Sequence, residues 1–78
     1  MSQRLPSLKP REVLRALERA GFYIHHHRAT SHAQLRHPED PSKRVTLPVH
    51  QGYDLPRGTL RNILKQAGMT PEEFASFL

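Results

Sequence analysis

The sequence contains neither cysteine nor tryptophan. Without cysteine the chain can form no disulfide bond, no zinc–thiolate site and no thiol nucleophile. It also lacks any apolar run near the roughly 20 residues that span a membrane, and its N-terminus lacks the apolar core of a secretory signal. These absences lead us to expect a cytoplasmic protein with no membrane partner. A chain this short should fold as one small domain, so that any active site is a shallow groove or a sheet face.

Acidic residues are scarce as well. The 78 residues include 7 Asp and Glu against 12 Lys and Arg, which gives a formal net charge of +5, and no acid lies between Glu18 and Glu39. Arginine is the commoner cation, and its planar guanidinium matches phosphate. The charge favours a polyanionic partner such as nucleic acid, although many small domains are basic without one. The dispersed carboxylates suit no magnesium site and no cofactor motif is present, so we expect neither metal nor cofactor.

Apolar residues at helical spacing predict two main helices. Pro10 suits the first turn of one helix, and Gly21 suits the position just after its end. The apolar stripe of this helix consists of Val13, Leu14, Leu17 and Ala20. The second main helix is predicted over residues 57–67, with Gly68 as its stop signal. Its apolar stripe consists of Leu60, Ile63, Leu64 and Ala67.

Thr70 and Glu73 form a capping-box pattern that predicts a short last helix. This helix should pack onto the domain through Phe74, Phe77 and Leu78. At the other end of the chain, residues 1–8 have few apolar groups and are expected to form a flexible lead-in. Residues 9–78 would then make up a single domain.

Alternating apolar residues predict three strands over residues 22–28, 31–37 and 43–48, with turn-forming residues 38–42 between the last two. The residues expected to face the core are Phe22, Ile24, Ser31, Ala33, Leu35, Val45 and Leu47. With one apolar face per strand, both main helices should cover the same side of a three-stranded antiparallel sheet, in an α+β fold. The open face would carry Tyr23, His25, His27, His32, Gln34, Arg36, Arg44 and Thr46.

Four segments, in this order, resemble the HicA family of toxin ribonucleases. They are Gly21-Phe22, Thr30-Ser31-His32, residues 44–50 with the sequence RVTLPVH, and residues 58–68 with the sequence GTLRNILKQAG. The resemblance spans about residues 9–77, which is nearly the whole chain. The last segment is the most specific of the four.

The resemblance implies a fold like that of the double-stranded-RNA-binding domain. It also implies an endoribonuclease that cleaves mRNA and arrests translation, held inactive by a HicB-like antitoxin. The catalytic residue of the family is the histidine of a Gly-Ser-His motif, which corresponds to His32 here, with Ser31 as the serine. The chain departs from the family at Thr30, where a glycine is expected, and at Ala33, where a second histidine often follows.

A histidine is suited to this chemistry, because it exchanges protons near neutral pH and RNA carries its own nucleophile, the 2′-hydroxyl. Nearby cations would stabilise charge on the phosphate without a metal. The residues expected to contact RNA are Arg28, Ser31, Gln34, Arg36, Arg44, Arg57, Arg61 and Lys65. His50, in the loop after the third strand, is a candidate assisting residue and equally a candidate for a hydrogen bond that orders that loop.

Other interpretations also fit the sequence. The same fold could bind structured RNA without cleaving it, since double-stranded RNA is recognised by shape and backbone contacts. The basic face could instead serve only a protein partner, and the flank formed by Arg57, Arg61 and Lys65 could bind an acidic antitoxin surface. Residues 25–27 are three consecutive histidines, but no carboxylate accompanies them, so a polar strand is favoured over a metal site.

Overall fold

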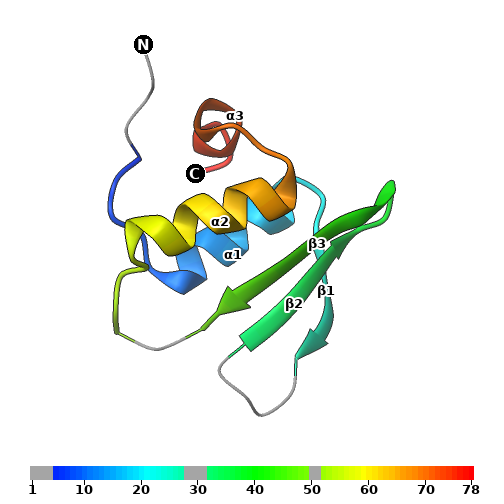
Figure 1. Ribbon diagram of the computed structural model, residues 1–78, viewed down its shortest axis with the longest axis horizontal. Coiled ribbons are helices and arrows are strands. Elements are labelled where there is room, and N and C mark those ends of the chain that lie inside the picture. The colour runs from blue at the N-terminus through cyan, green and yellow to red at the C-terminus, as the bar shows by residue number, and fades with distance from the viewer. Residues whose placement is uncertain (1–4, 28–31, 50–51) are drawn as a thin grey trace.

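The computed structural model describes residues 5–27, 32–49 and 52–78. Three antiparallel strands form one sheet in the order β1-β2-β3, which makes β2 the central strand (Figure 1). The elements along the chain are α1 (Pro10–Arg19), β1 (Tyr23–His27), β2 (His32–His37), β3 (Asp40–Pro48), α2 (Arg57–Ala67) and α3 (Pro71–Ala75). This order confirms the α+β fold predicted from the sequence.

The core lies between the sheet and the two main helices, which share one side of the sheet in Figure 1. The inward-facing residues of β2 and β3 are Ala33, Leu35, Val45 and Leu47. Each is at most 1% exposed. The predicted apolar stripe of α2 is buried in full, and its residues are Leu60, Ile63, Leu64 and Ala67. The opposite face of the sheet is left open, as expected for strands with one apolar face each.

The helix ends follow the predicted local signals. Gly68 ends α2 in a left-handed conformation, with φ of 69°. Thr70 caps α3, because its hydroxyl accepts a hydrogen bond from the Glu73 amide at 3.1 Å, while the Glu73 carboxylate accepts one from the Thr70 amide at 2.9 Å. The Glu73 carboxylate has a pKa below its usual value, first because of the hydrogen bond from the Thr70 amide and then because of the Thr70 side chain.

The first strand departs from the predicted alternation. Phe22 is buried as expected, but Ile24 is 39% exposed although it was expected to face the core. Ile24 lies on the edge strand β1 and pairs with Leu35 of the central strand β2. The pairing of the two strands shifts by one residue between Ile24 and His26. This bulge pairs His26 with Gln34 and His27 with Ala33. The backbone pairing at the end of the strand is therefore shifted by one residue from that of a regular strand, because a bulge adds one unpaired residue.

The third strand is longer than predicted. It begins at Asp40 rather than Lys43, so the predicted break over residues 38–42 shrinks to a turn at residues 38–39. Asp40 accepts two hydrogen bonds from Ser42, one from its amide at 3.1 Å and one from its hydroxyl at 2.6 Å. These bonds hold an irregular strand start, and Pro41 is tolerated there because β3 is an edge strand.

The two ends of the described chain also differ from expectation. Leu5 and Leu8 are 8% and 4% exposed and belong to the core, although this segment was expected to dock only weakly. The Leu55 amide donates a hydrogen bond to the Leu8 carbonyl at 2.8 Å, which ties the segment to the loop before α2. At the C-terminus Phe74 is fully buried, whereas Leu78, which was expected to pack, is 45% exposed.

Candidate functional site

The central strand carries three of the predicted site residues on the open face of the sheet. His32, Gln34 and Arg36 alternate with Ala33 and Leu35, which are both fully buried. His32 and Gln34 are exposed and Arg36 is half-buried. An imidazole, an amide and a guanidinium thus form a row along β2, as the alternation predicts.

Each member of this row has a partner on β3. His32 pairs with Pro48, Gln34 with Thr46 and Arg36 with Arg44. The Thr46 amide donates to the Gln66 side chain of α2 at 2.9 Å rather than to β2.

Gln34 and Thr46 are therefore a non-hydrogen-bonded pair of the ladder. Because the two kinds of pair alternate along antiparallel strands, the pairs His32/Pro48 and Arg36/Arg44 are of the same kind. In such pairs the side chains of opposing residues come closest. The outward side chains of the two strands are therefore brought together at these three rungs.

Arg36 and Arg44 place two positive charges opposite each other. Among the described residues, neither guanidinium forms an ion pair with a carboxylate, and Arg44 Nε donates only a long hydrogen bond to the Pro41 carbonyl at 3.5 Å. The acid at the start of β3, Asp40, is engaged by Ser42. Its pKa is below its usual value, first because of the Ser42 hydroxyl and then because of the Ser42 amide. This end of the open face therefore has positive charge available for an anion.

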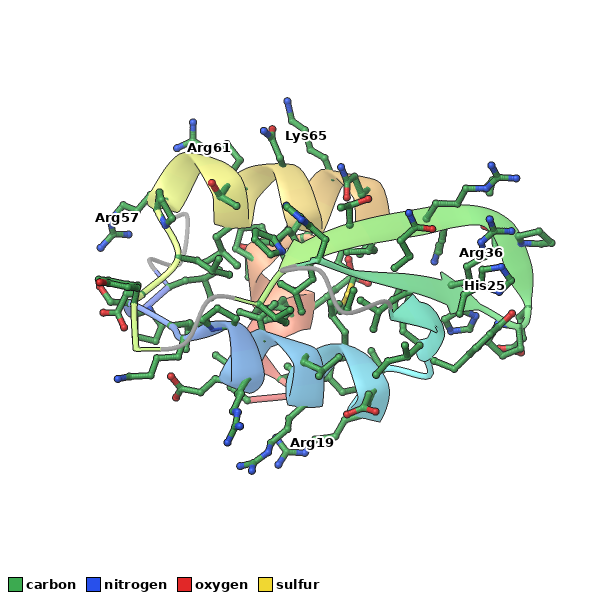
Figure 2. All side chains as sticks on the ribbon, turned by 90° about the horizontal axis from the view of Figure 1, so that it is seen from below. Arg19, His25, Arg36, Arg57, Arg61 and Lys65 are labelled. Carbon is green, nitrogen blue, oxygen red and sulfur yellow. The ribbon has the colours of Figure 1, made fainter. Side chains whose placement is uncertain are left out.

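A second basic group lies on α2. Arg57, Arg61 and Lys65 are all exposed; in Figure 2 Arg61 and Lys65 project from the same side of the helix, and Arg57 lies at its start. No acidic residue occurs in α2. Arg57 also donates a long hydrogen bond to the Leu5 carbonyl at 3.4 Å. In Figure 2 these three residues follow the helix, whereas Arg36 lies at the far end of the sheet, so the predicted contacts form two groups.

Three predicted site residues, Arg28, Ser31 and His50, lie outside the described residues. Thr30, which replaces the expected glycine, lies outside them too. Within the part of the chain that the structure describes, no three His, Asp or Glu side chains gather in a group that could hold a metal ion.

The site has one neighbour that the sequence did not single out as a contact residue. Tyr23 pairs with Arg36 from the β1 side and is 45% exposed. Its ring meets that of His25 edge-on, with 6.4 Å between the ring centroids. An exposed aromatic ring among cations is a common feature of nucleic-acid-binding surfaces. The sequence could have indicated Tyr23 as a contact residue, because it is an aromatic residue predicted on a cationic face. Its pairing with Arg36, however, follows only from the strand register.

A family model described as the HicA toxin of bacterial toxin-antitoxin matches residues 10–69 of the chain. The chain belongs to the HicA toxin family. The match runs from the start of α1 to just beyond α2 and includes the whole sheet. Membership of the HicA family makes the protein the toxin of a toxin–antitoxin pair. No curated protein sequence matches the chain significantly, and none of the helices in its described part is long and apolar enough to cross a membrane.

Proposed function

We propose that this HicA-family toxin is a metal-independent endoribonuclease that cleaves mRNA in the cytoplasm and thereby arrests translation. The observation that carries the proposal is the position of His32. Its imidazole is exposed at the start of the central strand, on the open face that also carries Gln34 and Arg36. A family model for toxins covers this strand. His32 also stands where the resemblance puts the catalytic histidine of the family.

The proposed chemistry needs one proton-transfer group and a few cations. His32 would remove the proton from a 2′-hydroxyl, or protonate the departing 5′-oxygen, at cellular pH. The 2′-oxygen attacks the adjacent phosphorus, and the bond from phosphorus to the 5′-oxygen breaks. The products are a 2′,3′-cyclic phosphate and a 5′-hydroxyl. Proton transfer of this kind contributes roughly 10²–10⁴-fold in rate.

The antitoxin would act by covering the groups that bind RNA. We propose a HicB-like protein as this partner, with an acidic surface that faces Arg57, Arg61 and Lys65 on α2. These side chains are exposed and lie on a helix without acidic residues, so they suit either an RNA backbone or an acidic protein surface. Occupation of the flank by the antitoxin would exclude RNA and keep the toxin inactive.

The proposal is tested by substitution of His32. The H32A variant should lose RNA cleavage and growth arrest while it keeps its fold, measured by circular dichroism, and its affinity for RNA. The matched control is His25→Ala, which removes an exposed imidazole from the neighbouring strand and should leave cleavage intact. The ends of the fragments should be 2′,3′-cyclic phosphates and 5′-hydroxyls.

Two results would count against the proposal in different ways. Cleavage that persists in the H32A variant would remove His32 from the reaction, and 5′-phosphate ends would exclude attack by the 2′-hydroxyl. If the wild-type protein binds RNA but cleaves none, the same fold serves as a non-catalytic RNA-binding module.

A further inference from the structure

Among the described residues of the open face, the paired arginines Arg36 and Arg44 lie away from His32. We propose that Tyr23, Arg36 and Arg44 form a distal nucleotide subsite, which holds the phosphate and stacks the base of a nucleotide remote from the cleaved bond. The inference rests on the proposed function, because it takes the substrate to be RNA that is cleaved at His32. It adds a requirement on the substrate, namely a single-stranded segment long enough to reach both places.

The three residues form one rung across the sheet. Arg36 on the central strand pairs with Tyr23 on β1 and with Arg44 on β3. Paired residues in neighbouring strands point to the same face, so all three side chains belong to the open face. One aromatic ring and two guanidiniums are thus contributed by three different strands to the same place.

The two arginines repel each other, and a phosphate group bound between them would be attracted to both. Like charges directly opposite in a sheet are destabilising. Here they occupy a non-hydrogen-bonded pair, in which the Cα atoms are only about 4.5 Å apart. Neither is neutralised by an ion pair with a carboxylate within the described residues. A phosphate between them would remove the repulsion and accept hydrogen bonds from both planar guanidiniums.

Tyr23 supplies a surface for the base of the same nucleotide. Its side chain is 45% exposed, and it lies on β1, which is an edge strand of the sheet. Stacking of a base on an exposed aromatic ring is favourable and is tolerant of sequence. A ring on one side of Arg36 and a second cation on the other therefore match the base and the phosphate of one nucleotide.

The strand geometry separates this subsite from the place of cleavage. His32 and Arg36 lie four positions apart on β2, which amounts to about 13 Å at roughly 3.3 Å per residue. Side chains on a strand stand roughly perpendicular to the sheet, which preserves that separation. Gln34 lies between the two, with an amide that can donate and accept hydrogen bonds. The RNA would run along β2, with its reacting phosphate at His32 and a further nucleotide at the distal subsite.

The inference predicts that cleavage depends on substrate length. Once the cleaved bond in a messenger RNA has been mapped, synthetic oligoribonucleotides that span it can be lengthened one nucleotide at a time on either side. For the wild-type protein, kcat/KM should rise by about tenfold or more when the oligonucleotide first reaches the subsite, as expected for charge-assisted hydrogen bonds. The Arg44→Gln variant should lose more of kcat/KM on the long oligonucleotides than on the shortest one that is cleaved.

The substitutions separate the distal subsite from the other possible roles of these residues. R44Q and R36Q should each abolish the rise in kcat/KM that accompanies the longer oligonucleotide. Y23L should reduce the gain, whereas Y23F, which keeps the ring, should preserve it. If R44Q lowers kcat/KM equally for short and long substrates, the arginine pair acts at the reacting phosphate and the inference is overturned. An unchanged gain with length in R44Q would overturn it as well.

A binding measurement keeps the inference testable apart from catalysis. Affinity for a long non-cleavable oligonucleotide is measured over a range of salt concentrations for wild type, R44Q and the control R15Q, which removes an exposed arginine from α1. Loss of one phosphate contact should reduce the slope of log K against log salt by about 0.7. R44Q should show this reduction and R15Q should not. Equal slopes for R44Q and wild type would refute the subsite, whereas absence of cleavage with a reduced slope would refute only the proposed reaction.

Discussion

The imidazole of His37 occupies the space that a side chain at position 21 would need, because a Cβ atom on Gly21 would lie 2.8 Å from His37 Nε2. The same nitrogen donates to the Ala20 carbonyl at 3.2 Å, and Nδ1 accepts from the Glu39 amide at 3.2 Å. A carbonyl can only accept and an amide N–H can only donate, so these two contacts match the Nε2–H tautomer of the ring. The His37 ring also meets the Phe22 ring edge-on, with 5.0 Å between the ring centroids. Together these contacts join the end of α1 to the end of β2.

The first prediction concerns this junction. Gly21→Ala should lower the free energy of unfolding by more than Gly52→Ala, measured by urea denaturation. Both glycines have positive φ, 102° and 82°, which costs a residue with a side chain about 1–3 kcal/mol. Gly52 has no atom within 4 Å of the added Cβ, so it isolates the backbone cost, whereas Gly21 adds the clash with His37. Equal losses would show that the imidazole moves aside freely.

The second prediction compares two residues that pair across β1 and β2. Leu35→Ala should cost about 2–5 kcal/mol of stability, because the side chain is fully buried and its loss leaves a cavity. Ile24→Ala should cost about 1 kcal/mol or less, because Ile24 is 39% exposed at the sheet edge. Chemical denaturation of both variants gives the comparison. A loss at Ile24 as large as that at Leu35 would mean that Ile24 is buried in solution.

The third prediction concerns acid sensitivity at the start of α3. The hydrogen bonds from Thr70 hold the pKa of Glu73 below its usual value of 4.5. The ionised carboxylate therefore adds stability above the unfolded-state pKa, and this contribution disappears as the pH falls through the lower folded-state pKa. Wild type should be more stable than Glu73→Gln at pH 7, and the difference should shrink towards pH 3. Denaturation curves across this range test the sign, and a difference that grows in acid would contradict it.

The fourth prediction concerns the paired arginines in the absence of RNA. Arg44→Gln should raise the free energy of unfolding by roughly 0.2–1 kcal/mol at low salt, because it removes a like charge directly opposite Arg36. Added salt should diminish this gain, since the charges are screened. Thermal denaturation at two ionic strengths measures both effects. Lower stability in R44Q at low salt would indicate that the long hydrogen bond to Pro41 outweighs the repulsion.

The features that could be predicted from the sequence depend on residues close together in the chain. The bounds of α2 and the cap at Thr70 follow from helical periodicity and adjacent capping residues. The outward row formed by His32, Gln34 and Arg36 follows from alternation within one strand.

The features that were not predicted depend on pairing with a distant segment. The bulge after Ile24 is defined by the register with β2, and the burial of Leu8 requires the loop that contains Leu55. The rung that joins Tyr23, Arg36 and Arg44 combines two such registers. Alternation alone gives the face of each residue but not its neighbour across the sheet.

The hydrogen bond from the Thr46 amide to Gln66 has a consequence for self-association. An edge strand normally presents free amides, on which a strand from another molecule can assemble. On β3 that amide is already occupied by α2, and Pro41 and Pro48 have no amide hydrogen to offer. Intermolecular growth of the sheet is therefore obstructed at these three positions of β3, which makes the short, bulged strand β1 the more open edge for aggregation.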